Sequence, residues 1–222
     1  MSERIGLYDN DLDEPAQREA FLNGDVPVAV YGLGKMGLPL ASVYADLTGS
    51  VVGADVDPDV VAAVNRGECH VDGEPGLAAL VDRTVEAGAL RAVDDPTEAA
   101  AEARLHVVIV PTLITDDGQP DLTVVESVIE DIAAGLQAGD LVVVESTVPP
   151  RTCQDVVVPR LAAGSGLDPT EFGVVFCPER TESGRALQDI RGSWPKIVGG
   201  VDSESTRAAA LVYDQVTDND VI

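Results

Sequence analysis

The feature of this sequence that most constrains its fold is a glycine-rich turn, Gly32-Leu33-Gly34-Lys35-Met36-Gly37, which lies between a short apolar run and an amphipathic segment. At a strand-to-helix turn, the first glycine permits the tight bend and the second lets a pyrophosphate approach the backbone. The third lets the helix pack closely on the strand. The N-terminus of that helix then faces the phosphates. The turn therefore predicts a dinucleotide site in a parallel α/β sheet.

A carboxylate follows at the place where such a site needs one. Asp55 ends the second apolar run, at the spacing of about 20 residues that separates the glycines from the ribose-binding acid in dinucleotide folds. Its carboxylate would accept hydrogen bonds from the adenosine ribose hydroxyls and would repel a 2′-phosphate. We therefore expect NAD rather than NADP. The competing interpretation is a glycine turn beside an unrelated strand-end aspartate.

Short Val-rich runs alternate with Ala-rich amphipathic segments along the rest of the chain, which is the βαβ pattern of a parallel sheet. The expected strands are 28–31, 51–54, 105–110, 141–145, 172–177 and a short run at 196–198. The expected helices are 36–47, 58–65, 77–87, 97–103, 122–136, 150–163 and 204–213. We predict a doubly wound, Rossmann-like α/β domain over 27–215, preceded by an acidic arm at 1–26 with one helix over 15–22. Such a fold by itself hosts many functions.

The charge of the chain excludes several classes of partner. It has 14 Lys and Arg against 39 Asp and Glu, a formal net charge of −25, and only two of the cations are lysines, Lys35 and Lys196. This field repels phosphate backbones and anionic lipid, so we expect neither nucleic-acid binding nor a membrane-surface role. We interpret the acidic surface as adaptation to molar salt, where screening is short-ranged. An acidic protein of ordinary salinity is the alternative.

Targeting and metal signals are weak. The apolar runs are far shorter than the roughly 20 residues of a spanning helix, and residues 1–10 lack the basic and then apolar order of a signal peptide. We expect a cytoplasmic protein. Three cysteines without a CxxC spacing and two isolated histidines, His70 and His106, indicate neither a disulfide framework nor a metal site.

Polar residues follow three more of the predicted strands, where ligands of open α/β sheets bind. Thr112 follows the run at 105–110, and Thr147 follows the run at 141–145. Either threonine could also be a helix cap or a plain turn residue. The fifth run leads into Pro178-Glu179-Arg180-Thr181, where an arginine suits a phosphate or carboxylate and a glutamate could position a water or take a proton. A surface ion pair is the alternative for Glu179 and Arg180.

Together these motifs resemble the UDP-glucose/GDP-mannose dehydrogenase family. The segments that carry the resemblance are 28–41, 53–58, 110–112, 145–149 and 172–184, with further matches at 65–68, 74–77 and 120–122. The chain is most similar to the UDP-N-acetyl-D-mannosamine dehydrogenase branch, which has Pro-Glu-Arg where the UDP-glucose enzymes have Pro-Glu-Phe. Ser183 stands where UDP-glucose enzymes have a second glutamate, which weakens UDP-glucose as the substrate.

The resemblance implies an NAD-dependent oxidoreductase that converts the C6 hydroxyl of a UDP-sugar, with UDP-N-acetylmannosamine favoured, to the uronate by two hydride transfers. The uronate would serve polysaccharide biosynthesis. Gly32, Gly34, Lys35, Met36 and Gly37 would then line the pyrophosphate, Asp55 would hold the ribose, and Thr112 and Thr147 would contact the cofactor. Glu179, Arg180 and Thr181 would face the substrate, with Glu179 and Thr147 as the candidate catalytic residues.

One departure from the family pattern is decisive. The family's lysine, asparagine and nucleophilic cysteine follow the first domain, on a long central helix and in a later segment, whereas this chain ends at Ile222. Residues 216–222 would only begin that region, and none of Cys69, Cys153 and Cys177 matches the nucleophile. We expect the central helix and the second domain to be absent, and this chain alone to be inactive. The family implies a homodimer built through the absent helix.

Two other functions stay open on the sequence. The glycine turn also resembles the opening of 3-hydroxyacid dehydrogenases, which would be expected to lack the Pro-Glu-Arg strand end. A non-catalytic module that binds NAD and signals to a partner is the third possibility, because the chain ends before the catalytic residues.

Overall fold

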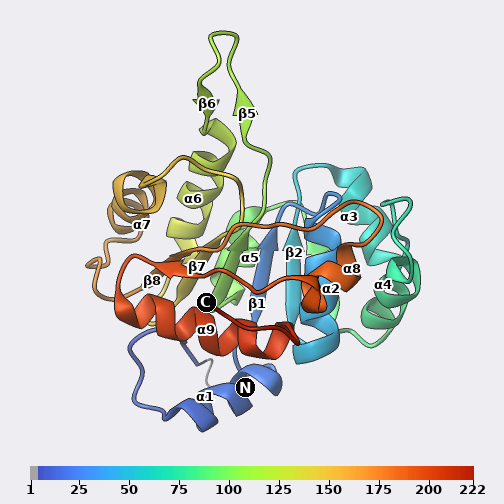
Figure 1. The fold of residues 1–222 in the computed structure, drawn as a ribbon, viewed down its shortest axis with the longest axis horizontal. Coiled ribbons are helices and arrows are strands. Elements are labelled where there is room, and N and C mark those ends of the chain that lie inside the picture. The colour runs from blue at the N-terminus through green and yellow to red at the C-terminus, as the bar shows by residue number, and fades with distance from the viewer. Residues whose placement is uncertain (1–4) are drawn as a thin grey trace.

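A sheet of seven strands, covered by helices on both faces, forms the centre of the computed structural model, which describes residues 5–222 (Figure 1). The strands are β1 (Val28–Tyr31), β2 (Val51–Ala54), β3 (Leu90–Val93), β4 (Leu105–Val108), β7 (Leu141–Val144), β8 (Gly173–Phe176) and β9 (Gly199–Gly200). Their order is β3-β2-β1-β4-β7-β8-β9, and all pairs are parallel except β8 with β9. The predicted doubly wound fold is confirmed.

Both faces of the sheet are buried, which is why its central strands read as continuous apolar runs. Val28 and Val30 of β1 pack into one core, and Ala29 and Tyr31 pack into the other. Helices α2 (Gly37–Thr48), α4 (Leu77–Glu86) and α9 (Ser203–Val216) cover the first core. Helices α5 (Pro96–Glu102), α6 (Thr123–Gly135) and α7 (Val158–Ser165) cover the second.

Several helix starts follow directly from capping residues. The Asp57 side chain accepts a hydrogen bond from the Asp59 amide at the start of α3 (Pro58–Asn65), and Asp95 accepts one from Thr97 at the start of α5. In both helices a proline occupies the first turn, where its missing N–H costs no hydrogen bond. No helix in the described part of the chain is long and apolar enough to span a membrane.

Two expectations about the strands are wrong. The edge strand β3 is absent from the predicted set, and the strand expected at 196–198 is replaced by β9, with Lys196 forming an isolated bridge to Val221. The helix expected at 150–163 is present, but it contains a π-helical turn at Cys153–Val157 before α7. The i to i+5 bond from the Val158 amide to the Cys153 carbonyl precedes Pro159, which has no N–H to continue an α-helical ladder.

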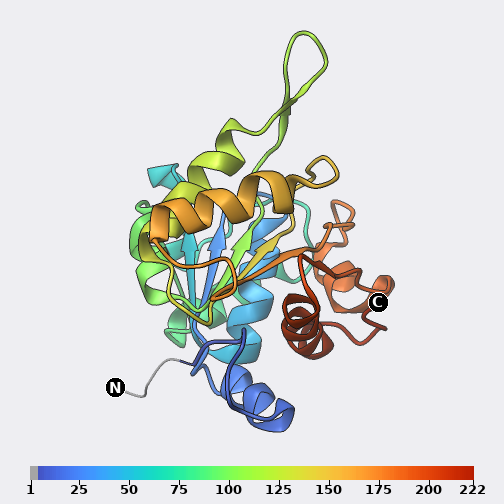
Figure 2. The ribbon, with the colours of Figure 1, turned by 90° about the vertical axis from the view of Figure 1, so that its left-hand side faces the viewer.

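An unexpected two-stranded hairpin connects β4 to α6. Strands β5 (Leu113–Ile114) and β6 (Pro120–Asp121) pair antiparallel and project away from the body of the domain (Figures 1 and 2). The turn contains Gly118 at φ 79°, a conformation that glycine adopts without strain. Leu113 and Ile114 are exposed.

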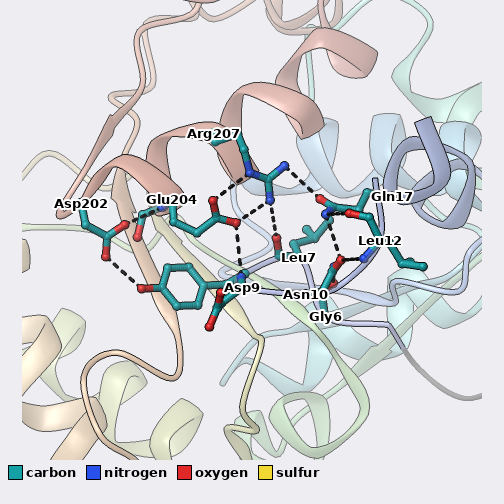
Figure 3. A network of polar contacts seen from close by, with 11 residues as sticks. Gly6, Leu7, Asp9, Asn10, Leu12, Gln17, Asp202, Glu204 and Arg207 are labelled. Carbon is teal, nitrogen blue, oxygen red and sulfur yellow. Dashed lines mark hydrogen bonds and ion pairs between the residues drawn. The ribbon is translucent and has the colours of Figure 1, made fainter. Parts of the chain in front are cut away.

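The N-terminal segment, residues 5–22, packs against the core and against α9. Leu7 and Phe21, the latter on α1 (Glu14–Leu22), are fully buried in the first core. Arg207 of α9 donates hydrogen bonds to Gln17 Oε1 at 3.0 Å and to the Leu7 carbonyl at 3.3 Å, and it pairs with Glu204 (Figure 3). The division of the chain between an arm at 1–26 and a domain at 27–215 stays a prediction.

Replacing Arg207 by alanine should weaken the attachment of this segment to α9 without releasing Leu7 and Phe21 from the core. We expect a loss of about 1–3 kcal/mol in the free energy of unfolding, because the half-buried guanidinium binds three groups at once. Arg18→Ala is the matched control, since Arg18 makes an exposed pair with Glu14 at 3.7 Å and should change stability by less than about 0.5 kcal/mol. Urea unfolding measures the stability of both variants. Equal losses of unfolding free energy would show that Arg207 does not stabilise the N-terminal segment.

Candidate functional site

The predicted site residues all lie at one edge of the sheet, where the parallel strands end. The glycine turn joins β1 to α2, Asp55 follows β2, Thr112 follows β4, Thr147 follows β7, and the segment 178–181 follows β8. The connection from β1 leads to β2 on one side, and the connection from β4 leads to β7 on the other side. This reversal of direction creates the crevice in which open α/β sheets bind ligands. The topology therefore brings the predicted residues to a common edge.

The glycine turn is closed toward the protein and open toward solvent. A Cβ at Gly37 would lie 1.8 Å from the Gly32 carbonyl oxygen, so only glycine permits this approach of helix to strand. Gly32 itself has φ +92°, and a Cβ there would lie 2.9 Å from the Ile109 carbonyl oxygen. A Cβ at Gly34 would meet nothing within 4 Å. The open position is the one where a pyrophosphate would approach the backbone.

The glycine turn is held in place by hydrogen bonds to the Leu33 N–H and to the Leu33 carbonyl. Asp55 Oδ2 accepts the Leu33 N–H at 2.7 Å, and its Oδ1 accepts the Asp57 N–H at 3.0 Å. His70 Nε2 donates to the Leu33 carbonyl oxygen at 2.8 Å. Asp55 thus shapes the turn besides standing where a ribose would bind. The contact from His70 is not predictable from a local motif, because this residue comes from the loop before α4 and lies 37 residues from Leu33 in the sequence.

The remaining predicted cofactor residues differ in exposure. Lys35 and Thr147 are exposed, and Met36 is half-buried. Thr112 has a buried hydroxyl that finds no hydrogen-bond partner among the described residues. The Thr181 hydroxyl lies 3.6 Å from the Met36 sulfur, so the segment after β8 reaches the first turn of α2. The geometry of the turn fits a dinucleotide bound along it.

A buried cluster of charged groups lies behind the segment 178–181. Glu145, at the end of β7, is wholly buried, and its Oε2 lies 3.3 Å from Lys196 Nζ. The same ammonium lies 3.4 Å from Glu179 Oε2. Tyr213 of α9 donates to Glu145 Oε1 at 2.5 Å. Lys196 is missing from the predicted site, because only the fold brings it to the ends of β7 and β8.

The pKa values of the two carboxyls in this cluster are shifted in opposite directions. Burial raises the pKa of Glu145 to about 7, although the Lys196 ammonium opposes the shift. Burial also acts to raise the pKa of Glu179, but Lys196 and the N–H groups of Arg180 and Thr181 outweigh it and lower that pKa. The two carboxylates in turn raise the pKa of Lys196 in spite of its burial. At neutral pH Glu179 is ionised and Glu145 is near its midpoint.

The cysteines are poorly suited to nucleophilic catalysis. Burial raises the pKa of Cys177 to about 12 and that of Cys153 to about 11, so both remain thiols at neutral pH. Cys69 donates to the Val71 carbonyl at 3.3 Å. Among residues 5–222 there is also no group of three or more His, Cys, Asp and Glu side chains that could hold a metal ion.

Comparison with known proteins identifies the same region. The sequence profile of the UDP-glucose/GDP-mannose dehydrogenase family, NAD binding domain, matches residues 26–217. UDP-N-acetyl-D-mannosamine dehydrogenase of Escherichia coli (strain K12) is 32% identical over 197 residues, which cover 84% of this chain and 44% of that protein.

Solved structures agree with the sequence matches. The UDP-D-ManNAc dehydrogenase from Pyrococcus horikoshii superposes with a TM-score of 0.83 at 29% identity, covering 89% of this chain and 46% of that one. A ternary complex of GDP-mannose dehydrogenase from Pseudomonas aeruginosa also gives a TM-score of 0.83, at 27% identity and with the same coverage. The chain spans less than half the length of these relatives.

The raised pKa of Glu145 predicts a pH-dependent stability. Because the folded pKa, about 7, lies above the reference value of 4.5, the folded chain holds an extra proton between these values, and this contribution to stability falls as pH rises through them. In Glu145→Gln the amide can bind both Lys196 and the Tyr213 hydroxyl without a charge. We expect the stability of the variant relative to the parent to grow by about 2–3 kcal/mol between pH 5 and pH 8.

Urea unfolding at each pH measures this difference. Glu19→Gln, at an exposed position of α1, is the matched control and should show a difference of less than about 0.5 kcal/mol across the range. A pH-independent difference for Glu145→Gln would contradict the raised pKa.

Proposed function

This chain belongs to the UDP-glucose/GDP-mannose dehydrogenase family, of which it is an NAD-binding domain, and from that premise we propose that it is the cofactor half of a nucleotide-sugar 6-dehydrogenase. The proposed reaction is oxidation of the C6 hydroxyl of a UDP-sugar to the uronate by two hydride transfers, which would feed polysaccharide biosynthesis. UDP-N-acetylmannosamine is the favoured sugar, because Pro178-Glu179-Arg180 matches the strand end of the UDP-N-acetyl-D-mannosamine dehydrogenase branch.

The observation that carries the proposal is the glycine turn, which is closed at Gly37, open at Gly34 and held by Asp55. NAD bound there supplies the hydride acceptor. We propose that Gly32, Gly34, Lys35, Met36 and Gly37 line its pyrophosphate. Asp55 accepts the ribose hydroxyls with the lone pairs that Leu33 and Asp57 leave unused, and its charge disfavours a 2′-phosphate. Thr112 and Thr147 contribute hydroxyls at the crevice.

We propose that the segment after β8 receives the sugar nucleotide. Arg180 offers a guanidinium for a phosphate, and Thr181 stands beside Met36, where the cofactor and substrate regions meet. Glu179 is ionised and can accept a hydrogen bond from a water, and we propose it with Thr147 as the candidate for acid–base catalysis. The family assignment favours this function over a 3-hydroxyacid dehydrogenase, since the profile extends over 26–217 and includes this segment.

We propose that this chain alone binds NAD without completing the reaction. The described cysteines are buried or hydrogen-bonded thiols, and the matched relatives are more than twice as long. Cofactor binding without any gain of activity on adding the second half of a relative would instead favour an NAD-sensing module. We further propose a cytoplasmic location and, for the complete protein, a homodimer.

Gly34→Ala should separate cofactor binding from folding. Because a Cβ at Gly34 meets no protein atom within 4 Å, the variant should unfold like the parent, within about 1 kcal/mol. The methyl group would nevertheless stand where the pyrophosphate approaches, so NAD affinity should fall at least roughly tenfold, about 1.4 kcal/mol. Calorimetric titration of NAD and NADP measures this in molar KCl.

The parent chain should bind NAD saturably and NADP much more weakly, and Asp55→Asn should narrow that difference by removing the repulsion of a 2′-phosphate. Gly37→Ala is the contrasting variant, because its Cβ would overlap the Gly32 carbonyl and should destabilise the fold itself. Equal NAD affinity in Gly34→Ala and the parent would refute the site.

We also propose that the acidic surface is an adaptation to high salt. A net charge of −25 on 222 residues is self-repulsive in dilute buffer, and the Debye length shortens to about 3 Å at 1 M salt. The melting temperature should therefore rise as KCl increases from about 0.1 M to several molar. Sucrose is the control, because it stabilises proteins by being excluded from their surface and does not screen charges. Equal melting temperatures in dilute buffer and molar KCl would exclude this adaptation.

A further inference from the structure

Lys196 is a buried cation that the proposed chemistry does not use. Its side chain is 12% exposed, and its ammonium lies between two carboxylates, 3.3 Å from Glu145 Oε2 and 3.4 Å from Glu179 Oε2. It also lies 4.9 Å over the ring of Tyr213. This lysine is distinct from the one that the family resemblance places after residue 222. A buried cation with two buried anionic partners is costly to maintain unless all three hold a defined geometry.

The Glu179 carboxylate connects this cation to the backbone of the substrate segment. Its Oε2 faces Lys196, while its Oε1 accepts the N–H of Arg180 at 2.6 Å and that of Thr181 at 2.7 Å. Turning the carboxylate away from Lys196 would therefore break both backbone hydrogen bonds. The position of Lys196 and the conformation of the segment 179–181 are thus coupled through one side chain.

The backbone that carries Lys196 is itself fixed. The Lys196 N–H donates to the Asp220 carbonyl at 2.8 Å, and the Ile222 N–H donates to the Lys196 carbonyl at 2.8 Å. The neighbouring Pro195 carbonyl accepts a hydrogen bond from the Arg180 guanidinium. The ammonium therefore reaches Glu179 from a paired segment behind the site.

We propose that Lys196 is the positioning residue of the substrate segment 178–181. By holding Glu179 inward, its ammonium keeps the N–H groups of Arg180 and Thr181 bound and thereby sets the direction in which this segment meets its ligand. The assignment of the segment to the sugar nucleotide rests on the proposed function. The link from Lys196 to the segment does not, so it can be tested without any ligand.

The test is amide hydrogen exchange, followed by NMR on the ligand-free chain of 222 residues. In Lys196→Met, the amides of Arg180 and Thr181 should exchange about tenfold faster or more, because each loses a charge-assisted hydrogen bond. The Glu182 amide is the internal control. It donates to Asp189 Oδ2 at 3.0 Å, independently of Lys196, and should change by less than about twofold.

Two further variants separate positioning from general destabilisation. Lys196→Met leaves Glu145 and Glu179 buried without their cation and lowers the stability of the whole fold. The double variant Glu145→Gln/Lys196→Met replaces the Glu145 carboxyl by an amide that stays neutral at every pH and should recover much of the melting temperature. We expect Arg180 and Thr181 to exchange fast in it even so. Glu145→Gln alone keeps Lys196 on Glu179 and should protect both amides as the parent does.

The outcomes that overturn the proposal are specific. Protection of Arg180 and Thr181 at the parent level in the folded double variant would show that Lys196 does not hold Glu179. Loss of protection in Glu145→Gln would show that Glu145 holds it instead. Failure of NAD to bind in the calorimetric experiment would refute the proposed function and leave these exchange results unaffected.

Discussion

The whole site depends on a contact between two backbones that no side chain could accommodate. Gly37 approaches the Gly32 carbonyl so closely that a Cβ would overlap it. This approach places the first turn of α2 directly against the end of β1. The Leu33 peptide groups are then fixed by Asp55 and His70. Because the protein's own groups hold this turn, ligand binding has less backbone entropy to lose in ordering it.

The parts of the fold that sequence could predict are those whose determinants are local. A pattern of a few neighbouring residues is enough to predict the glycine turn, the capping aspartates before Pro58 and Pro96, and the fully buried strands. The π-helical turn before Pro159 and the hairpin after β4 do not follow from the sequence pattern, since strands of two residues and helix irregularities leave little periodic signal.

The candidate site shows the same division between local and long-range determinants. The strand-end residues were predictable because a parallel sheet gathers its carboxyl ends, and the family resemblance added the roles. Lys196 could not be found this way, because the two carboxylates that it contacts, Glu145 and Glu179, lie 51 and 17 residues away in the sequence. The ammonium lowers the pKa of both carboxyls, and the burial of Glu145 together with the backbone N–H groups bound to Glu179 determines which of the two stays ionised.

Strand β3 was hidden from the apolar pattern by Arg91, which lies in its middle and pairs with Glu98 and Glu102. β3 is also the edge of the sheet, and at the opposite edge β9 is only two residues long. Exposed edges template the pairing of one chain with another, and a charge or a short strand blocks this. The arginine that obscures the strand thus also discourages edge-to-edge pairing, because a partner strand laid against β3 would have to accommodate its charge.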